Sequence, residues 1–295
     1  MIYLILCILS STGIFVIFKI IGHRQLPSFP VILINYFVAT TTGLLLGGRN
    51  LSFSQLFHNS WIPVSILIGF FFIVMFFLVA RSSSVAGISV TTVASKMSVV
   101  FPIVFSMSID PGDNLTLVKS LAILAALTGV LLTVYRPGIF HRASAGFIIP
   151  FILFVGMGMV DSLVKFAQYR YVGNDDRAAF SAILFLMAFL TGILCIPFIA
   201  KGSRSFKNKS VWLWGLLLGL VNFGSIYFMV SALNYVNPAG NRIDSSVIFG
   251  TNNIGIVTLS VMAGMLFFRE RLNPVNWMGI VISLISLLLF TISVS

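Results

Sequence analysis

Residues 2–21 read IYLILCILSSTGIFVIFKII, an apolar run in which Lys19 is the single charge. A transmembrane helix needs about 20 predominantly apolar residues, so this stretch alone predicts a membrane span. Along the rest of the chain, charges, prolines and glycines mark off further runs of the same kind. We predict ten spans, near 2–21, 29–48, 61–81, 84–109, 116–135, 144–169, 178–200, 211–234, 243–268 and 274–293.

The composition excludes several classes of protein. Of the 295 residues, 58% are hydrophobic and 8% are charged, whereas soluble domains carry about a quarter charged residues. Ten spans use roughly 200 residues, which leaves no stretch for a soluble enzyme, a receptor ectodomain or a fused ATPase. The net charge of +11 comes from Lys and Arg scattered singly, and a nucleic-acid footprint would cluster them. We therefore expect the lipid bilayer, and no nucleic acid, as a partner.

The distribution of Lys and Arg predicts the orientation of the chain, because cytoplasmic loops carry an excess of both. Eleven lie in or beside the odd-numbered connections and five in or beside the even-numbered ones. The eleven are Lys19, Arg24, Arg81, Arg136, Arg142, Lys201, Arg204, Lys207, Lys209, Arg269 and Arg271, and the five are Arg49, Lys119, Arg170, Arg177 and Arg242. This bias predicts that both termini lie outside the cytoplasm.

The chain also contains a weak internal repeat. The first span contains GIFVIFKIIGHR and the sixth contains MVDSLVKFAQYR, and a shift of 146 residues aligns Lys19 with Lys165. A shift of 158 aligns the fifth span with the tenth. We predict two halves, 1–140 and 141–295, with five spans each. An odd number of spans forces the halves into opposite orientations, and inverted repeats are a recurrent architecture of secondary transporters.

Three segments resemble EamA-type transporters of the drug/metabolite transporter superfamily. LFFRERLNPVNWMGIVISLISLLLF (266–290) resembles the closing motif, with Glu270 as its acid and Gly279 as its helix glycine. STGIFVIFK (11–19) resembles the family's first helix, and KMSVVFPIVFSM (96–107) resembles its Pro-containing fourth helix. The resemblance implies two five-helix repeats and transport of small metabolites, frequently export.

The sequence also departs from the family pattern. SIDPGDNL (108–115) replaces the closing acid in the first half, and the ninth span lacks the Pro of the fourth. Family members are often drawn with cytoplasmic termini, the opposite of the orientation that the charges predict.

Lys96 lies near the middle of its span. A centred Lys costs roughly 2.5–3.5 kcal/mol to insert, so we expect it to face a wet cavity or a partner. The alternative is snorkelling or an interhelical hydrogen bond. Pro102 removes a helical hydrogen bond and is expected to kink this span. Our hypothesis is that Lys96 binds the acidic group of a substrate, because such a group would offset the desolvation of the ammonium.

Other intramembrane polar residues complete the candidate site. Asp161 and Lys165 are spaced i, i+4 and share a helix face, so they form a neutralised pair unless Asp161 pairs with Lys96 or exchanges protons. Lys19, at the end of its span, is interpreted as reaching the headgroups. Asn side chains in lipid need partners, and neighbouring Asn residues of the ninth span point in different directions. The predicted substrate-binding residues are Lys96, Asp161, Lys165, Asn222, Tyr227, Asn252 and Asn253.

These patterns predict a secondary carrier of small metabolites, such as amino acids or other small organic solutes, that works by alternating access. No catalytic group, metal site or cofactor motif stands out, and there is no GxxxxGK[ST] phosphate loop. The energy would come from a proton, ion or substrate gradient. The alternatives are a membrane enzyme acting on lipid-linked substrates and a channel. We expect a multi-pass protein of the cell (inner) membrane, as a monomer or a homodimer.

Overall fold

The computed structural model describes residues 2–47, 62–109, 116–135, 145–171, 177–198, 206–233 and 245–294, which are helical apart from short turns. The helices before residue 140 are α1 (Ile2–His23), α2 (Ser28–Gly47), α4 (Ile62–Val85), α5 (Ile88–Met97), α6 (Val100–Ile109) and α7 (Leu117–Val134). The later ones are α8 (Ala145–Tyr171), α9 (Arg177–Cys195) with a 3-10 turn (Ile196–Phe198), α11 (Lys209–Leu233), α12 (Ser245–Phe268) and α13 (Pro274–Val294).

The helices form a multi-pass membrane bundle. Within the described residues, seven are long and apolar enough to cross a membrane, and three shorter apolar segments occupy the other predicted spans. Large apolar side chains such as Leu45, Leu124 and Leu266 are exposed on the outside, as expected of a surface that faces lipid. The predicted spans are confirmed as helices, and most of their ends agree within a few residues.

The fourth predicted span differs from the expectation. α4 continues to Val85, beyond the predicted residue 81, and the next helix begins at Ile88. This span is then interrupted by a turn at Ser98 and Val99 between α5 and α6. Pro102 explains the break, because it has no N–H to donate to the Ser98 carbonyl and its ring clashes with that group. The expected kink is confirmed.

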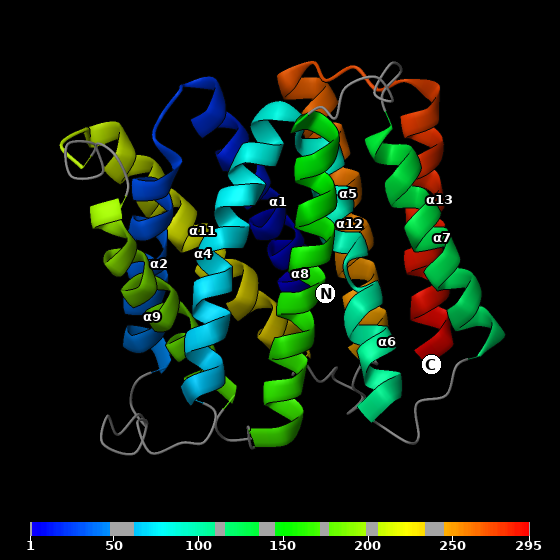
Figure 1. Cartoon of the computed structure of the whole chain (residues 1–295), viewed down its shortest axis with the longest axis horizontal. Helices are drawn as coiled ribbons and strands as arrows, with labels where there is room; N and C mark the ends of the chain where they lie inside the picture. Colours follow the sequence, from blue (N-terminus) through cyan, green and yellow to red (C-terminus); the bar gives the residue numbers. More distant parts are fainter. Residues whose placement is uncertain are drawn as a thin grey trace.

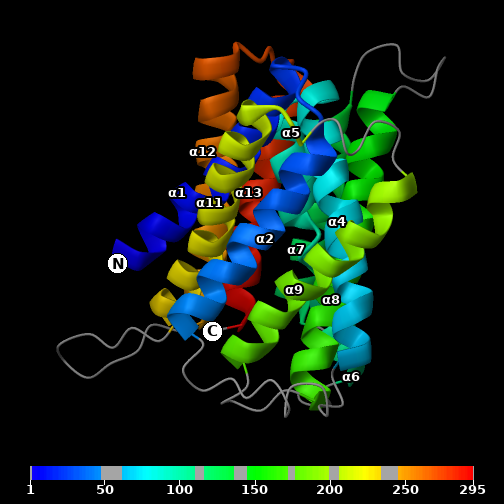
Figure 2. The same cartoon turned by 90° about the vertical axis from the view of Figure 1, so that its left-hand side faces the viewer.

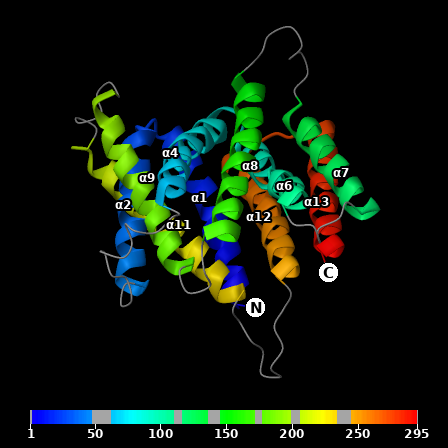
Figure 3. The same ribbon diagram turned by 60° about the horizontal axis from the view of Figure 1, so that its bottom comes forward.

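Figure 1 shows the helices running side by side, with α7 and α13 together at one edge and α2 and α9 toward the other. Figure 3, seen from below, places α1, α8 and α12 between these two edges. α5 lies in the interior, where it packs against α1, α4, α7, α8, α12 and α13. A charged side chain on α5 therefore has other helices on several sides.

The α7–α13 pair is held by close backbone contact. A Cβ on Gly279 would lie 2.8 Å from the Gly129 carbonyl oxygen, so only glycine allows this crossing. At the end of α7, the Asn276 amide nitrogen donates to three carbonyls, those of Leu132, Thr133 and Tyr135. These bonds tie the beginning of α13 to the last turn of α7, where the Leu132 carbonyl also accepts the Tyr135 N–H.

Candidate functional site

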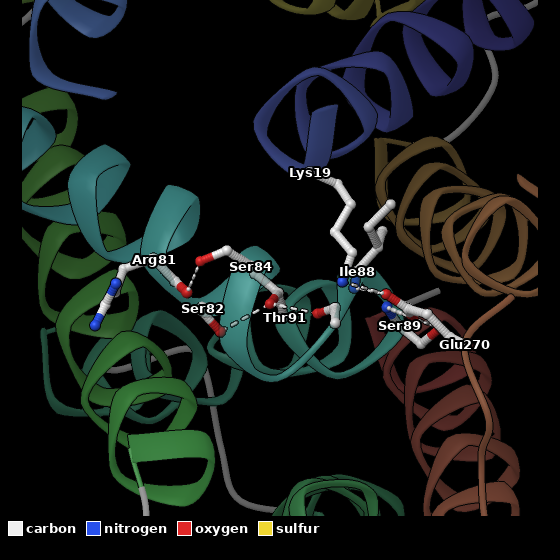
Figure 4. A network of polar contacts seen from close by, with 9 residues as sticks. Lys19, Arg81, Ser82, Ser84, Ile88, Ser89, Thr91 and Glu270 are labelled. Carbon is white, nitrogen blue, oxygen red and sulfur yellow. Dashed lines mark hydrogen bonds and ion pairs between the residues drawn. The ribbon is translucent and has the colours of Figure 1, made fainter. Parts of the chain in front are cut away.

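Glu270, just beyond α12, is at the centre of a cluster at one end of the bundle (Figure 4). Its Oε1 lies 3.1 Å from Lys19 Nζ and accepts the Ile88 N–H at 2.6 Å. Its Oε2 accepts from the Ser89 N–H at 3.2 Å and from the Ser89 hydroxyl at 3.0 Å. We call Lys19, Glu270, Ile88 and Ser89 the end cluster. It joins α1, α5 and the α12–α13 connection.

The end cluster uses the physical properties of a helix N-terminus. The first N–H groups of α5 have no partner within the helix, and the helix dipole favours a negative charge there. Two glycines make room for the carboxylate: a Cβ on Gly87 would lie 2.7 Å from Oε1, and one on Gly264 would lie 2.6 Å from Oε2. Gly87 also has a φ of +100°, which disfavours other residues. The Glu270 N–H donates to the Gly264 carbonyl at 2.9 Å.

The interpretation of Lys19 as a headgroup contact is wrong. Its side chain is only 10% exposed and is paired with an equally buried Glu270. Lys19 ends the first span and Glu270 follows the ninth. Successive spans alternate in direction, so the sequence already indicates that both residues lie at the same end of the bundle. The sequence does not show that their side chains meet. Breaking a buried pair typically costs about 3–5 kcal/mol, because one charge is left uncompensated.

The turn between α4 and α5 is held by hydroxyl groups (Figure 4). The Thr91 hydroxyl lies 2.7 Å from the Ser82 hydroxyl and donates to the Gly87 carbonyl, also at 2.7 Å. Thr91 and Ser82 are fully buried. The beginning of α5 is thus fixed both to α4 and to Glu270.

At the other end of α5, Lys96 and the following Ser98 lie beside Asp161 of α8. We call these three polar residues the midspan cluster. The Ser98 hydroxyl lies 3.3 Å from Asp161 Oδ2 and 2.6 Å from the Ser95 carbonyl. Lys96 and Asp161 lie close enough to attract each other, yet among the described residues they form no direct ion pair. Lys96 is partly exposed. Its charge is therefore not neutralised by a contact.

Cys7 of α1 belongs to the surroundings of the midspan cluster. Its thiol lies near Lys96 and donates to the Ser225 carbonyl of α11 at 3.2 Å. Cys7 is 1% exposed, and both it and Cys195 are free thiols. α1, α5 and α8 thus contribute groups near Lys96, and Cys7 links α1 to α11.

The structure brings Asp161 to Lys96 and gives the predicted Asn residues different surroundings. The Asn222 amide nitrogen donates at 3.1 Å to Asn35 of α2, a partner that the sequence analysis missed. Asn252 is buried and its Oδ1 has no partner. Asn253 is half-buried.

The two remaining predicted residues are Tyr227 and Lys165. Tyr227 is 48% exposed, and its ring stacks on Phe223 with centroids 5.8 Å apart. The Lys165 side chain lies outside the described residues. Within the described part of the chain, no three His, Cys, Asp or Glu side chains form a group that could hold a metal ion.

Comparison with known families shows which family the chain belongs to. The EamA-like transporter family matches residues 144–292, which is half of the chain. The chain belongs to this family. As an EamA-family protein it is a membrane protein of transporter type. The match covers the closing motif that contains Glu270.

Two further proteins are similar to this EamA-family protein over nearly its whole length. An uncharacterised protein of Haemophilus influenzae is 27% identical over 290 residues, covering 95% of this chain and 94% of its own. A protein of known crystal structure has a TM-score of 0.59 and 15% identity, with 99% of this chain and 96% of that chain covered. At this identity the likeness concerns the fold alone.

Proposed function

We propose that this protein is a secondary active transporter that exports small organic metabolites, such as amino acids, across the cell (inner) membrane. Transport would proceed by alternating access, driven by a proton, ion or substrate gradient. The moving units would be the halves 1–140 and 141–295, related as inverted five-helix repeats.

The packing of the helices supports two exchangeable halves. If α1, α2 and α4 correspond to α8, α9 and α11, then the contact of α1 with α11 corresponds to that of α8 with α4. The contact of α2 with α11 likewise corresponds to that of α9 with α4, and α7 packs on its counterpart α13. Most contacts of these helices therefore cross from one half to the other. Such an interface suits two units that rock against each other.

The observation that carries the proposal is the state of Lys96. An ammonium in the interior of a bundle is costly, and in this one Asp161 attracts it without a direct ion pair. Its partial exposure on an interior helix favours an opening inside the bundle. The carboxylate of a solute would complete the coordination of Lys96. Lys96 and Asp161 come from different proposed halves, so a solute held there would contact both.

The break after α5 supports the same position for the site. Non-helical backbone within a membrane is tolerated where protein or a water-filled cavity covers it. The turn at Ser98 and Val99 lies next to Lys96. Interrupted helices near the midplane are typical of substrate sites in secondary transporters.

Reconstitution of the pure protein into liposomes tests the proposal. Vesicles loaded with unlabelled solutes, including anionic, zwitterionic and neutral ones, are mixed with the corresponding labelled solutes. Counterflow of a labelled solute above that of empty liposomes is expected. Covalent conversion without flux would instead indicate a membrane enzyme, and flux that does not saturate would indicate a channel. Either result would overturn the proposal.

A further inference from the structure

Three helices meet at the end cluster, and each carries a buried polar atom without a partner. Lys19 is on α1, Ile88 and Ser89 begin α5, and Gly264 of α12 accepts the Glu270 N–H. The hydroxyls of Thr12, Thr92 and Ser260 are buried and form no hydrogen bond. They belong to α1, α5 and α12, respectively. Figure 2 shows α1, α5 and α12 in the same part of the bundle.

The three hydroxyls lie on the same helix faces as the end cluster. Thr92 follows Ile88 by four residues, Ser260 precedes Gly264 by four, and Thr12 precedes Lys19 by seven. Residues four or seven apart share one face of a helix. With a rise of 1.5 Å per residue, Thr92 and Ser260 lie about 6 Å inward from the end cluster, and Thr12 about 10 Å.

The same face of α5 continues to the midspan cluster. Lys96 follows Thr92 by four residues, so Ile88, Thr92 and Lys96 form one row along α5. α12 carries a further unpaired atom on its row, Oδ1 of Asn252, eight residues before Ser260. The polar row therefore leads from the end cluster to Lys96.

Buried polar groups normally have hydrogen-bond partners, and leaving one without a partner costs free energy. Thr92 and Ser260 are 0% exposed, so apolar residues of similar size would stabilise this one conformation better. Hydroxyl groups at these positions are favourable if the helices separate in another conformation, because water then supplies the missing hydrogen bonds. Other unpaired atoms exist outside these helices, among them Ser283 Oγ and Trp214 Nε1, but they do not form a row between two charged clusters.

We propose that the facing rows of α1, α5 and α12 line the passage from this end of the bundle to Lys96, and that the end cluster is its gate. This inference rests on the proposed function, since a passage and a gate belong to a carrier. Glu270 is the positioning residue of the gate. Its carboxylate binds α1 and α5 at once while its backbone is bound to α12.

The geometry explains how the gate opens. Releasing Glu270 detaches α5 and α1 from the α12–α13 connection together, because both bind the same carboxylate, while α5 stays bound to α4 through Thr91 and Ser82. The break at Ser98 and Val99 separates α5 from α6, so α5 can tilt without carrying α6 with it. Opening then exposes Thr92 and Ser260 to water.

Thiol labelling tests the gate without knowledge of the solute. In a Cys7→Ser/Cys195→Ser background, Thr92→Cys introduces a single thiol, and its rate of alkylation by N-ethylmaleimide is measured in detergent. With the end cluster intact we expect slow labelling. Glu270→Gln or Lys19→Met should speed it up about tenfold, which corresponds to about 1.4 kcal/mol in the ratio of open to closed protein. In Lys19→Met, Glu270 still accepts the N–H groups of α5. This variant therefore tests the gate if Glu270→Gln does not fold.

Two controls separate gating from loosening of the fold. Lys209→Met removes an exposed Lys at the beginning of α11 and should leave the labelling of Thr92→Cys unchanged. Ser286→Cys places a thiol at an equally buried position, where the native hydroxyl donates to Ala122, and it should stay protected in all variants.

Three outcomes would overturn the gate. They are fast labelling of Thr92→Cys with the end cluster intact, no acceleration in either gate variant, and equal acceleration of Thr92→Cys and Ser286→Cys. The labelling is independent of flux. Accelerated labelling without counterflow of any solute would refute the proposed transport and leave an opening controlled by Glu270. Counterflow without accelerated labelling would refute the gate and leave the carrier.

Discussion

A pair of a Lys and an acid lies at each end of α5, and the two pairs differ in how completely they are neutralised. At the beginning of α5, Glu270 forms an ion pair with Lys19 at 3.1 Å and accepts three further hydrogen bonds. At the other end, Asp161 attracts Lys96 without a direct ion pair. Each pair joins a residue before position 140 to one after it.

The difference separates a contact that holds the protein in one conformation from a group that can bind a ligand. The carboxylate of Glu270 is occupied on both oxygens, so a solute could reach it only by displacing protein groups. The ammonium of Lys96 has free hydrogen-bonding capacity. Replacing Lys96 should therefore affect transport, and replacing Glu270 should affect stability and opening.

The largest expected effect is on transport by Lys96→Met, a change that keeps the length of the side chain and removes the charge. We expect transport of an anionic solute to fall about 100-fold or more, because the partner of a desolvated carboxylate is lost. Lys96→Arg should rescue it only partly, since the guanidinium is larger and binds with a different geometry. Liposome counterflow measures both. Transport at the wild-type rate in Lys96→Met would show that Lys96 has a structural role.

The next largest effect is on stability. Glu270→Ala leaves Lys19 buried without a counter-ion and the N–H groups of α5 without an acceptor. We expect the free energy of unfolding in detergent to fall by about 3 kcal/mol. Glu270→Gln keeps an acceptor oxygen and should lose less.

Arg271→Gln, at an exposed neighbouring position, is the matched control and should change stability by less than about 0.5 kcal/mol. Equal stability of Glu270→Ala and the wild type would mean that the end cluster does not hold the helices together.

A small effect is expected for Ser98→Ala. The Ser98 hydroxyl is 3.3 Å from Asp161, and hydrogen bonds between membrane helices average about 0.6 kcal/mol. The affinity for the solute should change less than about threefold, which is the equivalent of that energy. A loss as large as that of Lys96→Met would make Ser98 part of the binding site itself. Thermal unfolding and counterflow distinguish the two results.

The orientation of the protein in the membrane can be tested with a fusion to its C-terminus, which leaves every residue of the two clusters unchanged. A fluorescent protein that matures only in the cytoplasm is fused after Ser295. The excess of Lys and Arg in the odd-numbered connections predicts no fluorescence, which would put the end cluster on the cytoplasmic side. Bright fluorescence would reverse the assignment and make the end cluster an outer gate.

The sequence predicts the helices well because their signal is local. Twenty apolar residues identify a span, and Pro102 identifies a break because its effect reaches only to Ser98. The end of α4 was predicted too early, since the polar residues after Ala80 face the protein interior: Ser82 and Ser83 are fully buried there. A hydropathy pattern does not distinguish such residues from a loop.

The candidate site was only partly predictable because its contacts are distant along the chain. In the sequence, Lys96 and Asp161 are costly charges inside the membrane, and their pairing is one of the alternatives that it leaves open. The ion pair of Lys19 with Glu270 and the bond of Asn222 to Asn35 join residues more than 180 positions apart. Their closeness depends on how the helices pack, which single-helix patterns do not encode.

Equilibrium binding of the transported solute to two Lys variants tests the central claim most directly. Lys19→Met and Lys96→Met each remove one ammonium from one end of α5, and binding is measured with the labelled solute on purified protein. We predict that Lys19→Met retains binding and that Lys96→Met loses it. Loss of binding in Lys19→Met with retention in Lys96→Met would contradict the division between a gate and a binding site.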